Sequence, residues 1–183
     1  MTRKPPSLAR DSTLPGFAYS QSVFEQMVQD ALSEAKKLGA SDAAVEVSEG
    51  CGLSVSVRLG ELENVERNRD KSLGVTVYSG QRRGSASTSD FSTAAMRQTV
   101  RAAFDIARFT AEDPAAGLPD ERDQASAAQA RRDLDLFYPW SIDAAQAAEL
   151  ARACEEAAMS TDTRIANSEG AGVSAQQFHF WSG

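Results

Sequence analysis

The chain has 183 residues, of which 42% are hydrophobic and 25% charged, and its formal net charge is -7. This composition is typical of a soluble globular protein with one core of ordinary size, and it disfavours direct binding to nucleic acid, which needs clustered lysine and arginine. The sequence has no apolar run of about 18 residues, so we expect no membrane-spanning helix.

The first 19 residues are rich in proline, serine and charge and lack the apolar stretch of a signal peptide, so we expect a flexible tail at 1–19. The rest, 20–183, is expected to form one domain with an irregular connector at about 110–140. Cys51 and Cys154 are the only cysteines, too few for a disulfide framework. A reducing cytoplasm is therefore the favoured location.

Apolar residues at helical spacing predict a first helix that starts near Ser20 or Ser22. Gly39 stands where a glycine commonly follows a helix. Alternating apolar residues then predict a strand at 43–48, and the glycines of 49–52 predict a turn.

Between residues 53 and 88, apolar and polar residues alternate as in half-buried strands. We predict an antiparallel meander with turns at 60–61, 68–71 and 79–81. The alternation fails within 61–67, where we expect a bulge or irregular pairing. Small residues in 83–88 indicate close packing by a neighbouring element, for which the following helix is the candidate.

Ser89, Asp90 and Ser92 are candidate caps for a second helix, and Ser141, helped by Asp143, for a third. The third helix is predicted to bury the stripe Ala147, Leu150, Ala151, Cys154 and Ala158. A short strand at 164–167 and a returning strand at 173–181 complete the pattern. Strands flanked by helices without regular alternation predict an α+β fold, an antiparallel meander packed by two to three amphipathic helices.

The chain shows no obvious catalytic residues. His179 is its only histidine and has no acidic neighbour in the sequence, so a packing or surface role is favoured over a zinc or catalytic role. Cys154 is predicted to be buried and inert, and Cys51 to lie in the glycine turn without a base. We predict no catalytic, metal-binding or cofactor-binding residue.

The polar segment 61–71 is the candidate contact surface, because its pattern is irregular for a strand. Its candidate contacts with a partner or a peptide are Glu63, Glu66, Arg67 and Arg69. The alternative interpretation is an ordinary solvated hairpin, and the same holds for acid-base chemistry by the carboxylates of Glu61, Glu63 and Glu66.

Several motifs recur in the order found in one known family. They are GLSVSVRLGELENVE (52–66), SLGVTVYSGQRRGSASTSD (72–90), AAFDIARFT (102–110), DPAAGLPD (113–120), LDLFYP (134–139) and RIANSEGAG (164–172). In these motifs the chain resembles the N-terminal region of the PmbA (TldE) family, once described as modulators of DNA gyrase. The resemblance extends over nearly the whole chain after residue 20.

The resemblance implies a cytoplasmic protein about twice this length or more. Family members pair with a homologous TldD subunit in a zinc metallopeptidase that trims or degrades peptides, and the zinc ligands belong to TldD. The chain would then be a non-catalytic N-terminal domain with no cofactor of its own, whose partners are a TldD-like subunit or a second copy. The alternative is a non-enzymatic interaction module that modulates a partner such as DNA gyrase. The apolar residues of 178–181 also favour a longer polypeptide or a partner chain.

Overall fold

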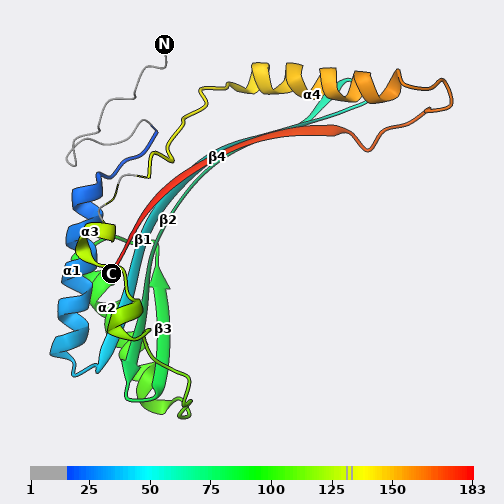
Figure 1. Ribbon diagram of the computed structural model, residues 1–183. Coiled ribbons are helices and arrows are strands. Elements are labelled where there is room, and N and C mark those ends of the chain that lie inside the picture. The colour runs from blue at the N-terminus through cyan, green and yellow to red at the C-terminus, as the bar shows by residue number, and fades with distance from the viewer. Residues whose placement is uncertain (1–15, 131, 133) are drawn as a thin grey trace. The chain divides into compact units, whose positions relative to one another are not determined.

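The computed structural model describes residues 16–130, 132 and 134–183, and Figure 1 shows their helices and strands. The larger elements in chain order are α1 (Gln21–Lys37), β1 (Asp42–Arg58), β2 (Glu61–Ser79), β3 (Arg82–Thr88), α2 (Thr93–Phe109), α4 (Ala144–Met159) and β4 (Ala171–Ser182). Between α2 and α4 lie a short 3-10 helix, η1 (Glu121–Asp123), and one helical turn, α3 (Ala127–Ala130).

The four strands form one sheet in the order β3-β2-β1-β4. β2 and β3 are antiparallel, and their register runs from Leu73 opposite Thr88 to Ser79 opposite Arg82. The α+β fold and the antiparallel meander are therefore confirmed. None of the described helices has the length and the apolar character needed to cross a membrane.

Contacts within the chain define two compact units. Among the described residues, unit 1 comprises those of 16–49, 71–137 and 179–183, and unit 2 comprises 50–70 and 138–178. The predicted tail, 1–19, lies mostly outside the described residues, but Phe17 is described and only 8% exposed.

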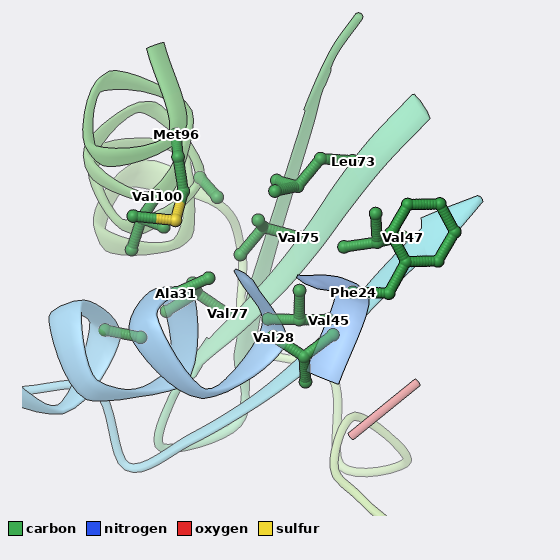
Figure 2. Packing of buried hydrophobic residues seen from close by; sticks show 12 residues of the cluster. Phe24, Val28, Ala31, Val45, Val47, Leu73, Val75, Val77, Met96 and Val100 are labelled. Carbon is green, nitrogen blue, oxygen red and sulfur yellow. The ribbon is translucent and has the colours of Figure 1, made fainter. Parts of the chain in front are cut away.

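The core of unit 1 lies between one face of the strands and the two helices α1 and α2. Figure 2 shows its main side chains, which are Phe24, Val28, Ala31, Val45, Val47, Leu73, Val75, Val77, Met96 and Val100. α1 begins after Ser20, and Gly39 follows its end at a φ of +91°, as predicted. Ser92 caps α2 by accepting a hydrogen bond from the amide of Ala95 at 3.3 Å.

The small residues of β3 allow α2 to lie close, as predicted. A Cβ added at Gly84 would overlap the backbone oxygen of Ala103 and the backbone nitrogen of Ala107. Glycine is therefore required here by the approach of two backbones rather than by a turn.

The core of unit 2 is smaller and is built on alanine. Leu53, Val55 and Val57 of β1 pack against α4, which contributes the buried residues Ala147, Ala148 and Ala151. Asp143 caps this helix in a capping box with Gln146, so the prediction of Ser141 as the cap is wrong.

The predicted apolar stripe of α4 is partly wrong. Ala147 and Ala151 are buried, but Leu150 is 49% exposed, and Cys154 and Ala158 are also exposed. The face that meets the sheet instead includes Ala148 and Glu155. Small side chains bring the helix close to β1, and a carboxylate is tolerated on this face because its oxygens are hydrogen-bonded.

Two predicted turns and one predicted strand are absent from the described chain. β1 continues through 49–52 and β2 through 68–71. Both glycines lie next to β4 within the strand, and Gly52 leaves room for the side chain of Gln176, which an added Cβ would overlap. No strand forms at 164–167, where Arg164 bonds to the nearby carboxylate of Asp162 at 2.7 Å.

Candidate interaction surface

The segment of β2 from Glu61 to Asp70 is an open strand edge. β3 pairs with β2 only from Leu73 to Ser79, so in the described part of the chain this segment has β1 on one side and no strand on the other. Every residue from 61 to 70 is exposed. The edge of a sheet is a place where a strand of another chain can add through backbone hydrogen bonds.

The four side chains predicted as partner contacts all lie on this open edge. Glu63, Glu66, Arg67 and Arg69 are exposed on one strand rather than on a hairpin tip, since the turn itself is at Leu59 and Gly60. Glu63 Oε2 accepts a hydrogen bond from Ser56 Oγ of β1 at 3.3 Å. Their role as contacts remains a prediction.

A buried carboxylate of α4 holds the turn that leads into this edge. The two oxygens of Glu155 accept hydrogen bonds from the amides of Leu59 and Gly60, each at 2.8 Å. Arg152 Nε donates to the carbonyl oxygen of Gly60 at 2.9 Å. Leu59 has a φ of +50°, an uncommon value for a residue with a side chain, and these contacts hold it there.

The hydrogen bonds to Glu155 also lower the pKa of its carboxyl group. The amide of Gly60, then the hydroxyl of Ser168 and the amide of Leu59, hold the pKa of Glu155 below its ordinary value. Glu155 is not among the residues predicted from the sequence. The available signal was its position four residues after Ala151 and eight after Ala147, on the buried face of α4.

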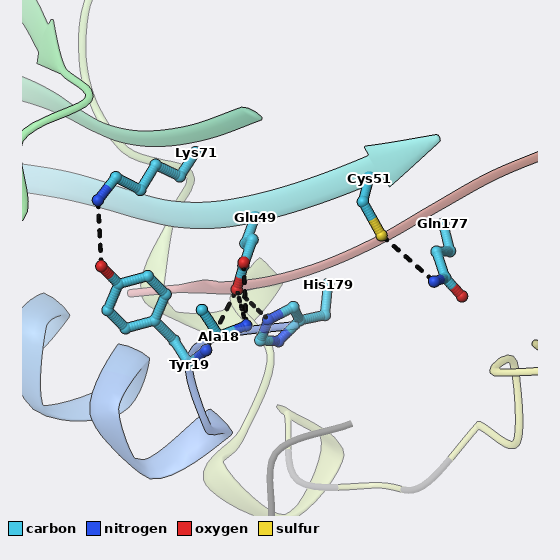
Figure 3. Close-up of polar contacts among 7 residues, drawn as sticks. All are labelled: Ala18, Tyr19, Glu49, Cys51, Lys71, Gln177 and His179. Carbon is cyan, nitrogen blue, oxygen red and sulfur yellow. Dashed lines mark hydrogen bonds and ion pairs between the residues drawn. The ribbon is translucent and has the colours of Figure 1, made fainter. Parts of the chain in front are cut away.

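A second buried carboxylate lies in unit 1, where Figure 3 shows its contacts. Glu49 of β1 is 2% exposed, and its oxygens accept hydrogen bonds from the amide of Ala18 at 3.0 Å and from the amide of Tyr19 at 3.2 Å. Lys71 Nζ donates to the hydroxyl of Tyr19 at 3.1 Å. These contacts fix the residues before α1 to β1 and β2.

His179 is a packing residue, as favoured from the sequence. Its ring lies 4.5 Å from that of Phe24 and 4.4 Å from that of Phe17, measured between centroids. Its Nε2 lies 3.6 Å from Glu49 Oε2, an acidic neighbour that only the pairing of β1 with β4 supplies. Burial lowers the pKa of His179, and Glu49 opposes this effect only in part.

Cys51 was predicted to lie in a turn and Cys154 to be buried on the third helix, and both predictions are wrong in part. Cys51 is in β1, where its Sγ accepts a hydrogen bond from Gln177 Nε2 at 3.2 Å, and Cys154 is exposed on α4 (Figure 3 shows the former). Across the described residues, no three His, Cys, Asp or Glu side chains gather in a way that would hold a metal ion.

The fold and the sequence together define the class of protein. Residues 43–107 match the family described as PmbA/TldA metallopeptidase domain 1. The chain belongs to the PmbA/TldD family, of which this segment is the first domain.

Two curated proteins are similar to this chain in sequence. Metalloprotease PmbA of Escherichia coli O157:H7 is 49% identical over 148 residues, which are 79% of this chain and 32% of that protein. The metalloprotease PmbA homolog of Haemophilus influenzae is 47% identical over 146 residues, 80% of this chain and again 32% of that protein. The chain thus spans about a third of the length of these relatives.

Two solved structures share the fold. TldE from Thermococcus kodakarensis aligns with a TM-score of 0.57 at 14% identity, over 87% of this chain and 34% of that one. A protein of Bacteroides thetaiotaomicron, described as a proposed modulator of DNA gyrase, aligns with a TM-score of 0.65 at 19% identity, over 86% and 40% of the two chains.

Proposed function

We propose that this chain is the N-terminal, non-catalytic domain of a PmbA/TldE-like subunit that pairs with a TldD-like zinc metallopeptidase to process or degrade peptides. The observation that carries the proposal is the 49% identity to a protein named metalloprotease PmbA. The chain spans 32% of that relative, so the peptidase activity is proposed for the complete complex rather than for these residues.

In this proposal the zinc ion belongs to the TldD-like partner, and no metal ligand is assigned to this chain. The ring of its single histidine, His179, is stacked on that of Phe24 and tilted against that of Phe17, which is a packing environment. We infer that the complex works in the reducing cytoplasm, without direct contact with nucleic acid or membrane.

A peptidase assay of each subunit alone and of the two subunits together tests the proposal. The protein containing this domain, a TldD-like subunit and their mixture are each incubated with an unstructured peptide, with and without a zinc chelator. We expect cleavage by the mixture only, and loss of that cleavage on chelation. Cleavage by this protein alone that survives chelation would overturn the proposal.

A second candidate function is a non-enzymatic module that acts on DNA gyrase. It is favoured by one observation, the description of the Bacteroides relative in fold as a proposed modulator of that enzyme. The test is a gyrase supercoiling assay with this protein in the absence of a TldD-like subunit. A specific effect there, together with an inactive mixture in the peptidase assay, would favour the module.

A further inference from the structure

The open edge of β2 carries a symmetric pattern of charge. At alternate positions it reads Glu61, Glu63, Val65, Arg67 and Arg69, and all five side chains are exposed. β2 is a continuous strand through this segment, and alternate residues of a strand share a face. The acidic half and the basic half of this row are therefore equally spaced on either side of Val65.

We propose that two copies of this chain pair through this edge, antiparallel and in register about Val65. A two-fold axis at Val65 places Glu63 of each copy opposite Arg67 of the other, and Glu61 opposite Arg69. Val65 then meets Val65. Such an interface is isologous, since one patch meets the same patch on the second copy.

The arrangement of charges on this edge favours a second copy of this chain as the binding partner. Opposite charges that face each other across antiparallel strands attract, whereas a parallel arrangement in register would set glutamate against glutamate and arginine against arginine. The segment 61–70 contains no proline, which would block backbone pairing, and it carries charges of both signs. Pairing would also cover Leu62 and Val65, which are 49% and 42% exposed.

The contact is small, so the dimer is weak and depends on salt. A single pair of strands buries less surface than a typical stable interface. Its ion pairs remain near solvent, where added salt screens them. This inference concerns two copies of this chain and stands apart from the proposed pairing with a TldD-like subunit.

Charge exchange within the row tests the proposal by sedimentation velocity over a range of protein concentrations. Glu63→Arg alone and Arg67→Glu alone each set like charges face to face, and we expect each to raise the dimer dissociation constant about tenfold. The double variant Glu63→Arg/Arg67→Glu restores opposite charges in the symmetric pair and should return the constant to near its original value.

Glu156→Arg is the matched control, because this exposed glutamate of α4 lies off the edge, and it should leave the dissociation constant unchanged. A wild-type chain that stays monomeric at every concentration in low salt would overturn the proposal. So would single variants that dimerise as well as the wild type, or a double variant as weak as the singles. Circular dichroism shows that each variant is folded.

Discussion

Unit 1 and unit 2 bury their strands in different ways. In unit 1, large side chains of two helices, such as Phe24 and Met96, cover valine and leucine of β1 and β2. In unit 2, alanines of one helix cover Leu53, Val55 and Val57 of β1, and the partly buried Ala171 and Val173 of β4 pack against the same core. Apolar area removed from water is the main favourable term, so unit 1 has the larger share of it. Each unit also buries a carboxylate, Glu49 in unit 1 and Glu155 in unit 2, and the open edge of β2 belongs to unit 2.

Removal of the largest buried side chain of unit 1 is expected to have the largest effect. Phe24 is fully buried, and Phe24→Ala should lower the free energy of unfolding by about 3–5 kcal/mol, because it removes apolar contacts and leaves a cavity. Urea unfolding measures this change. Phe109→Ala is the control, because Phe109 is 86% exposed and the same change there should cost little. Equal losses would show that unit 1 does not depend on this burial.

An added methyl group tests how closely α2 lies on β3. Gly84→Ala pushes a Cβ into the backbone of Ala103 and Ala107, and we expect a loss of about 1–3 kcal/mol in the free energy of unfolding. Gly74→Ala in the adjacent β2 is the control, since nothing lies within 4 Å of the added Cβ. If thermal and urea unfolding show the two variants to be equally stable, the close packing of α2 is contradicted.

The turn of unit 2 should depend on the charge of Glu155. Glu155→Gln keeps the shape but weakens two hydrogen bonds, so the amides of Leu59 and Gly60 should exchange with deuterium about tenfold faster at neutral pH. Because the pKa of Glu155 is lowered from 4.5, its stabilising effect is present above that pH and is lost as the pH falls further. The difference in amide exchange rate between the wild type and Glu155→Gln should therefore become smaller at acidic pH. Glu156→Gln, on the exposed face of α4, should leave both amides unchanged.

The smallest expected effect is the pH dependence that His179 gives to unit 1. Burial lowers its pKa from 6.5, so the folded state favours the neutral ring, and stability is complete above that pH and falls below it. The chain has one histidine, so urea unfolding between about pH 7 and about pH 5.5 reports on this residue. His179→Phe should make the free energy of unfolding depend less on pH over this range. A wild-type protein that gains stability toward pH 5.5 would contradict this assignment.

Local chemistry was enough to predict features that depend on a few neighbouring residues. The cap at Ser92, the glycine after α1 and the close packing at Gly84 follow from the preferences of single residues. The turns at 49–52 and 68–71 were wrong because glycine and polar residues interrupt a strand only where no neighbouring strand holds them.

The functional features that sequence reasoning missed depend on contacts between distant parts of the chain. Glu155 binds amides that precede it by 96 and 95 residues, and Glu49 binds one that precedes it by 31. No local pattern identifies a glutamate with such partners. Exposure of residues 61–70 was predictable from their polarity, but the open edge follows from the short pairing of β3 with β2, which ends at Leu73.

The most direct test of the contrast between the two units is hydrogen exchange along β2 at two protein concentrations. Amides of 73–79, paired with β3, should be protected equally in dilute and concentrated solution. Within 61–70, the amides that face the open edge should exchange quickly when dilute and gain protection when concentrated, because a second copy then pairs with them. Protection in 61–70 that is independent of concentration, or equal to that in 73–79 at every concentration, would contradict the open edge and its pairing.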